Sequence, residues 1–109
     1  MDKNFYITTP IYYPSANPHM GHAYSSIIAD FFARCKRIQG SKVFFLTGTD
    51  EHGLKIQRAA EKKGMSPKDF CDEISITFRE LSKILNLSNN DFIRTTELRH
   101  SKSVQNLWN

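Results

Sequence analysis

The sequence lacks the features that would place it in a membrane, a secretory route or a disulfide-stabilised fold. No apolar run approaches the ~20 residues that a membrane-spanning helix needs, and the first residues show neither a signal-peptide nor a transit-peptide pattern. Its two cysteines, Cys35 and Cys71, lie far apart within apolar helical patterns, which favours small buried side chains over a disulfide or metal pair. We therefore expect a reducing, cytoplasmic setting with no membrane contact, and no protein partner is evident.

The sequence also lacks any segment in which charges of one sign are concentrated. The formal net charge is +4 over 109 residues, but no run of basic residues is longer than two, as at Lys62-Lys63. A mildly basic chain can bind a polyanion such as nucleic acid, and it can equally be an ordinary globular protein. Charge alone does not separate these two interpretations.

Apolar periodicity divides the chain into alternating strands and helices. We expect strands at 5–9, 43–47 and 91–94, and helices at 20–38, 54–63, 67–85 and from 96 onward. Gly40 and Gly64 should follow helix ends, and Ser66 should cap the next helix. The second strand is almost continuously apolar, which predicts that both of its faces are covered. This order indicates an α/β fold, the first half of a Rossmann-like doubly wound parallel sheet.

In such a sheet, ligands bind in the loops that follow the carboxyl ends of the strands. The two loops here contain neither GxGxxG nor a P-loop, so another group would have to hold a phosphate. The candidate is His19-Met20-Gly21-His22 at the first turn of the long helix, where free N–H groups and the helix dipole favour an anion. His19 and His22 are three residues apart and can face one ligand. Gly21 leaves room for a flat base or ribose, so the tetrapeptide predicts a triphosphate cradle.

The same residues allow other interpretations. Two histidines three apart also suit a metal, but no third or fourth ligand lies at a convincing spacing, so we expect no metal site. The histidines could equally lie on the surface without a role. Asp50, which follows the second strand, can hold a substrate ammonium by a charge-assisted hydrogen bond. Alternatively, Asp50 or Thr49 could cap the following helix.

Three segments resemble the methionyl-tRNA synthetases, a family of class I aminoacyl-tRNA synthetases. Residues 7–24, ITTPIYYPSANPHMGHAY, resemble the family's first signature with its HIGH motif, here with Met at the second position. Residues 44–53, FFLTGTDEHG, resemble another family segment, and residues 94–100, RTTELRH, resemble its continuation. The resemblance runs in one register from about Phe5 to the last residue.

The resemblance implies a two-step ligase that uses ATP and Mg²⁺. The carboxylate of methionine would attack the α-phosphate of ATP, pyrophosphate would leave, and the methionyl adenylate would pass to the terminal adenosine of tRNA(Met). Catalysis would consist of positioning and of stabilising charge on the phosphates. His19 and His22 would donate hydrogen bonds to the phosphates, and Gly21 would let the adenosine lie close.

Four residues match positions of the family's methionine pocket: Pro10, Ile11, Tyr13 and Asp50. Ile11 and the ring of Tyr13 offer an apolar, polarisable wall to the thioether. Asp50 would hold the ammonium group of the amino acid.

By the same resemblance, residues 1–109 are the N-terminal part of the catalytic domain. The KMSKS loop, the connective domain with any zinc site and the anticodon-binding domain are missing, and the residues present do not support zinc. We therefore expect the chain alone to be incomplete and inactive. Two alternatives stay open: an inactive fragment, and a nucleotidyltransferase-like HxGH domain. The second typically carries a GxFD-like stretch before HxGH, where this chain has YYPSAN at 12–17.

Overall fold

The computed structural model describes residues 3–109. Its elements are β1 (Asn4–Thr8), α1 (Met20–Ile38), β2 (Lys42–Thr49), α2 (Leu54–Lys62), α3 (Pro67–Ile84), β3 (Asp91–Arg94) and α4 (Leu98–Trp108). The three strands pair in parallel in the order β1-β2-β3. Each strand and helix predicted from the sequence is therefore present, with ends shifted by one or two residues, and the α/β prediction is confirmed.

The central strand β2 holds the other two at different points along its length. Its first half pairs with β1 and its second half with β3, so Leu46 lies opposite both Thr8 and Asp91. Beyond β1 the chain returns to β2 through a bridge between Tyr12 and Thr49. The Tyr12 amide donates to the carbonyl of Gly48 (3.0 Å), and the amide of Asp50 donates to the carbonyl of Tyr12 (2.8 Å). These bonds hold the loop after β1 against the carboxyl end of β2.

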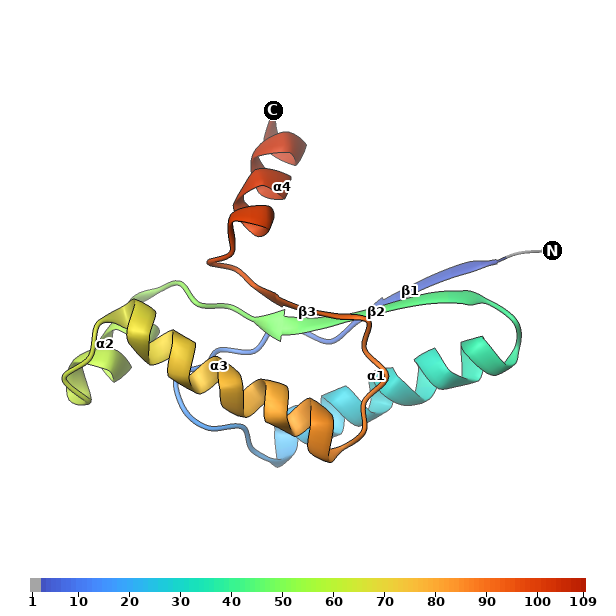
Figure 1. Cartoon of the computed structure of the whole chain (residues 1–109), viewed down its shortest axis with the longest axis horizontal. Helices are drawn as coiled ribbons and strands as arrows, with labels where there is room; N and C mark the ends of the chain where they lie inside the picture. Colours follow the sequence, from blue (N-terminus) through green and yellow to red (C-terminus); the bar gives the residue numbers. More distant parts are fainter. Residues whose placement is uncertain (1–2) are drawn as a thin grey trace.

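The sheet is covered on one face only among the described residues, which corrects the prediction for β2. Helices α1, α2 and α3 lie on one side of the strands, and α4 rises on the other side (Figure 1). Phe45 points toward α1 and is fully buried, whereas Phe44 and its neighbour Tyr6 remain 45% and 63% exposed. The apolar run of β2 has two apolar faces, but these 109 residues supply covering helices for only one of them.

Two apolar clusters hold the helices to this face. Ala29 and Ala33 of α1 pack on Phe45, and their small side chains let the helix lie close to the strand. The second cluster joins the loop after β1, α2, α3 and β3, through Tyr12, Ile56, Ala60, Phe70, Cys71, Ile74, Phe78 and Phe92. None of the helices in residues 3–109 is long and apolar enough to cross a membrane.

Local capping follows the sequence. The Ser66 hydroxyl accepts from the amide of Asp69 (3.1 Å) and starts α3 with Pro67 in its first turn. Helices α1 and α2 end just before Gly40 and Gly64, as predicted.

One glycine lets two strands approach each other. A Cβ atom at Gly48 would lie 1.9 Å from the carbonyl oxygen of Ile93, in the neighbouring strand β3. Real Cβ atoms do not approach backbone oxygens so closely, so any side chain at this position would push β3 away from β2.

A buried carboxylate ties α1 to the loop before β3. Asp30 accepts from the amide of Ser88 (2.7 Å), from its hydroxyl (2.5 Å) and from Arg34 Nε (2.8 Å). Burial raises the pKa of Asp30, but the hydrogen bonds from Ser88 and Arg34 outweigh it and hold the pKa below its usual value. This attachment orients α1, whose first turn carries the two histidines.

Candidate functional site

The loop after β1 and the start of α1 enclose a hollow of about 560 Å³ at the carboxyl edge of the sheet. Its lining consists of Ile11, Tyr12, Tyr13, Ser15, Ala16, Asn17, His19, His22 and Lys55. The position agrees with the rule that ligands of open α/β sheets bind beyond the strand ends. Both predicted histidines and two predicted methionine-pocket residues thus lie around one space.

His19 and His22 cap α1 reciprocally. His19 is the N-cap residue, and its Nδ1 accepts from the amide of Gly21 (3.0 Å). In return, Nδ1 of His22 accepts from the backbone amide of His19 (3.0 Å). The two rings are held 4.0 Å apart, centroid to centroid. This is the geometry of a capping box, which Ser or Thr and Glu or Gln usually form.

The reciprocal cap fixes which ring nitrogen of each histidine carries the proton. An Nδ1 atom that accepts a hydrogen bond has no proton, so a neutral imidazole must carry its proton on Nε2. Burial first, and the neighbouring charge of His19 second, lower the pKa of His22 and favour this neutral form. Each ring can therefore donate from Nε2 to a ligand without losing its cap.

Gly21 has a structural role beyond the predicted contact with adenosine. A Cβ atom at Gly21 would lie 2.8 Å from Cε1 of His19 and 3.1 Å from its Nδ1. A side chain there would displace the His19 ring from the amide that it caps. Gly21 is therefore needed for the geometry of the histidine pair as well as for any close approach of a ligand.

Tyr12, which the sequence analysis did not single out, orients His22. Its ring lies edge-on to His22 (4.8 Å between centroids) and stacks on Phe78 (5.9 Å). Its hydroxyl bonds to Ser26 Oγ (3.0 Å) and donates to the carbonyl of His22 (3.3 Å). The only sequence signal was that Tyr12 is aromatic and lies between Ile11 and Tyr13. A loop has no regular periodicity, so the sequence does not show which of these three side chains points into the protein.

The four predicted methionine-binding residues are placed differently from one another. Ile11 and Tyr13 line the hollow and are 45% and 52% exposed, so their apolar surfaces are available to a ligand. Pro10 and Asp50 are not among its lining residues in the described chain. Asp50 nevertheless adjoins the hollow through its amide, which donates to the carbonyl of Tyr12.

The alternative role of Asp50 or Thr49 as a helix cap is wrong. The N-cap residue of α2 is Gly53, with φ of 111°, and α2 has no side-chain cap. Thr49 Oγ1 donates to Glu51 (2.7 Å), and the carboxylate of Asp50 accepts from the amide of His52 at 3.4 Å. The turn at Gly53 begins α2 too late for either residue to reach its free amides.

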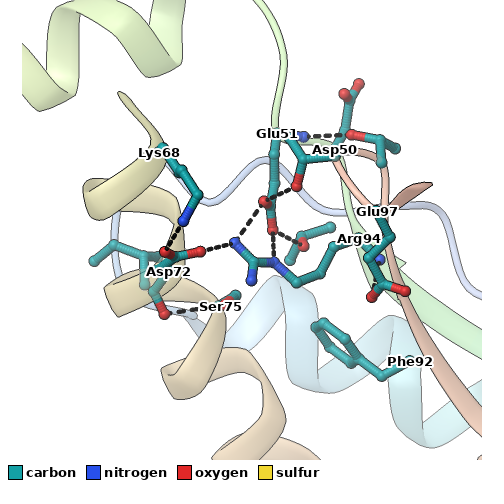
Figure 2. Close-up of polar contacts among 12 residues, drawn as sticks. Asp50, Glu51, Lys68, Asp72, Ser75, Phe92, Arg94 and Glu97 are labelled. Atoms are coloured by element: carbon teal, nitrogen blue, oxygen red, sulfur yellow. Dashed lines mark hydrogen bonds and ion pairs between the residues drawn. The ribbon is translucent and has the colours of Figure 1, made fainter. Parts of the chain in front are cut away.

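A buried ion pair supports the segment that carries Asp50 (Figure 2). The Glu51 side chain is 0% exposed and accepts from Arg94 Nε (2.7 Å) and Nη2 (2.8 Å). Thr49 and Thr96 also donate to this carboxylate, and the Glu51 amide donates to Thr95 Oγ1 (2.8 Å). The network fixes the end of β2 to the end of β3 directly beside Asp50.

At the more exposed end of the network, the ion pairs continue to α3. Arg94 Nη2 also donates to Asp72 (2.6 Å), which is 41% exposed and pairs with Lys68 (Figure 2). Sequence analysis missed this network because Glu51 and Arg94 are far apart in the chain, and a charged residue is exposed by default.

The described residues contain no group of three or more His, Cys, Asp or Glu side chains that could hold a metal ion. Among them, the lining of the hollow has no carboxylate, and its one cation is Lys55, which the sequence analysis also missed. The arrangement can donate hydrogen bonds and positive charge to an anion, and it offers an apolar wall beside that anion.

A family model described as "tRNA synthetases class I (M)" matches residues 5–109. The chain is 56% identical over 107 residues to the mitochondrial methionine–tRNA ligase of Takifugu rubripes, covering 98% of this chain and 18% of the relative. It is also 56% identical over 108 residues to methionine–tRNA ligase of Listeria monocytogenes, covering 98% and 16%. The chain thus spans less than a fifth of the length of these curated relatives.

A solved structure agrees with the sequence relatives. Methionyl-tRNA synthetase of Mycobacterium tuberculosis, bound by methionyl-adenylate, superposes with a TM-score of 0.94 at 45% identity. The match covers 97% of this chain and 21% of that one.

Proposed function

The chain belongs to the class I (M) tRNA synthetase family, and from this premise we propose that it forms the ATP- and methionine-binding part of a methionine–tRNA ligase. The observation that carries the proposal is the reciprocal cap of His19 and His22, which leaves two Nε2 donors beside the start of α1. A nucleotidyltransferase-like HxGH domain is not needed to explain the chain.

In this proposal the histidines act on the phosphates of ATP. Their Nε2–H groups donate to oxygens that gain negative charge as the methionine carboxylate attacks the α-phosphate. The dipole of α1 adds positive potential at the same place. Because both rings are already held by their own backbone partners, little reorganisation is required when charge develops.

The methionine pocket is proposed beside this site. Ile11 and Tyr13 would contact the thioether, and Asp50 would pair with the ammonium group. Pro10, the fourth predicted residue, would belong to the same methionine pocket. Support comes from the exposed apolar surface of Ile11 and Tyr13 and from the fixed position of the chain at Asp50. The M. tuberculosis relative is bound by methionyl-adenylate, the intermediate that this arrangement would form.

Mg²⁺, tRNA(Met) and a cytoplasmic location belong to the proposal as family expectations. The donor set of the hollow does not fit a protein-bound Mg²⁺, since no carboxylate of the described chain lines it. The residues therefore act as donors to the phosphates rather than as metal ligands. The two free cysteines, Cys35 and Cys71, suit a reducing compartment.

The test is a chimaeric enzyme in which this chain replaces the matching segment of the L. monocytogenes relative. It should catalyse methionine-dependent exchange of pyrophosphate into ATP, whereas the 109-residue chain alone should not, because it lacks the clamp that the family's second signature provides. Replacing His22 with Ala in the chimaera should lower exchange by about 10²–10³-fold, the usual cost of one lost donor to a developing charge. A folded chimaera without exchange, or robust exchange by the isolated chain, would contradict the proposal.

A further inference from the structure

A second hollow, of about 740 Å³, runs along α2. Its lining consists of Ser15, Leu54, Lys55, Arg58, Ala59, Lys62, Lys63 and Phe70. Four of these residues are cationic, and within residues 3–109 no carboxylate lines the groove. We call this feature the α2 groove.

The cations of the α2 groove have no anionic partner in the described chain, and Lys63 alone among them lies over a ring, that of Phe70 at 5.8 Å. No ion pair or side-chain hydrogen bond among residues 3–109 involves Lys55, Arg58, Lys62 or Lys63. The other arginines are committed, four to hydrogen bonds (Arg34, Arg37, Arg94 and Arg99) and Arg79 to the ring of Phe92. Arg58 is thus the one arginine among residues 3–109 that has no side-chain partner, and it lines this groove.

Their spacing produces a row rather than a scattered set. Lys55, Arg58 and Lys62 are three and four residues apart, so they follow one face of α2. With a rise of about 1.5 Å per residue, the row extends roughly 10 Å along the helix axis. A row of cations in a groove suits a linear polyanion better than a single small anion.

The α2 groove adjoins the hollow that contains the histidines. Ser15 and Lys55 line both spaces. A chain lying in the groove would therefore end beside His19, His22 and Tyr13, where the activated amino acid would form. Leu54, which lines the α2 groove and is 57% exposed, offers apolar contact to a base or ribose.

From these observations we propose that the α2 groove binds the phosphate backbone of a single-stranded RNA 3′ end and guides its terminal ribose to the site. This assignment rests on the proposed function, because the ligase reaction requires such an acceptor. An acidic protein segment could also match the charge, but it would not explain why the groove opens onto the reacting group.

The experiment uses the chimaeric enzyme with Arg58→Gln and Lys62→Gln together. Gln has a helix propensity close to those of Lys and Arg, so α2 should be preserved. The matched control is Lys42→Gln with Lys102→Gln, which removes the same charge from exposed residues outside the groove. Affinity for tRNA(Met) is measured over a range of KCl concentrations, next to pyrophosphate exchange.

We expect exchange to remain unchanged and RNA binding to weaken in the groove variant only. Each lost phosphate contact on a single strand lowers the salt slope of log K by roughly 0.7, so the double variant should lose roughly 1.4. A salt slope of the groove variant equal to that of the control variant would overturn the proposal. A groove variant that loses stability but keeps its RNA affinity would overturn it as well. This second result is expected if an acidic protein segment fills the groove. If the chimaera failed in exchange, the proposed function would fail, while the RNA titration would still decide on the groove.

Discussion

Replacing Glu51 with Gln tests whether the buried ion pair holds the ligand-facing end of the sheet. The carboxylate receives four hydrogen bonds, two from Arg94 and one each from Thr49 and Thr96. Gln keeps one acceptor oxygen but turns an amide N–H₂ toward donors, and the charge of Arg94 loses its buried partner. The substitution therefore removes more than one bond.

The expected cost follows from the burial of the two partners. Breaking a buried pair by removing one member costs about 3–5 kcal/mol. Arg94 is 20% exposed and keeps Asp72 at 2.6 Å, so we expect the lower end, about 3 kcal/mol. Since small domains have total stabilities of about 5–15 kcal/mol, this is a large fraction.

Urea unfolding of the 109-residue protein, followed by circular dichroism, measures this cost. Trp108 is 89% exposed at the end of α4, so its fluorescence would report little about the network. With a slope of about 2 kcal/mol per molar urea, the midpoint should fall by roughly 1.5 M. The matched control is Asp72→Asn, whose side chain is 41% exposed and should contribute less than about 1 kcal/mol.

A double-mutant cycle makes the test sharper. Glu51→Gln and Arg94→Met together should cost less than the sum of the two single substitutions, with a coupling of about 0.5–3 kcal/mol. A loss below about 1 kcal/mol for Glu51→Gln, or simple additivity, would show that the pair does not act as a buried unit.

Two further predictions concern the site itself. In the chimaeric enzyme, Asp50→Asn should raise the methionine dissociation constant by roughly 10²–10⁴-fold, since a lost buried charge pair costs about 3–5 kcal/mol. Stability should hardly change because Asp50 caps no helix. An unchanged dissociation constant in a calorimetric titration would remove Asp50 from the pocket. His22 has a pKa below its usual 6.5, so the native state binds fewer protons than the unfolded state. Its contribution to stability is complete above about pH 6.5 and is lost as the pH falls through the lowered pKa. His22→Gln, which keeps a capping-box acceptor without titrating, should therefore lose less stability than the parent between pH 7 and 5. Identical pH profiles of the two proteins would contradict the lowered pKa of His22.

The sequence predicted the elements and the histidine pair for sound physical reasons. Helical spacing places positions three apart on one face, and this is where His19 and His22 lie. Family membership, expected from the same stretch, is confirmed by the match over residues 5–109. The mutual cap was not foreseen, because capping depends on the φ and ψ angles before the helix, and histidine is not among the usual N-cap residues.

Other features depend on contacts between distant parts of the chain. Tyr12, Lys55 and the pair of Glu51 with Arg94 reach their positions only when β1, β2 and β3 are aligned. Similarly, the apolar pattern of β2 shows two apolar faces but not which segment covers each. These are properties of register and topology, which a local pattern does not contain.

Gly48 shows how this architecture would appear in a survey of all single substitutions. A side chain there would collide with the Ile93 carbonyl and move the strand that ends at Arg94, the partner of buried Glu51. Position 48 would therefore tolerate almost no replacement, and under the proposed function the exchange activity of the chimaeric enzyme would fall as well. By activity alone it would be scored beside His19 and His22, the proposed ATP-binding residues, although Gly48 contacts strand backbone. Only a measurement of the amount of folded protein would separate a residue that spaces two strands from one proposed to donate to a phosphate.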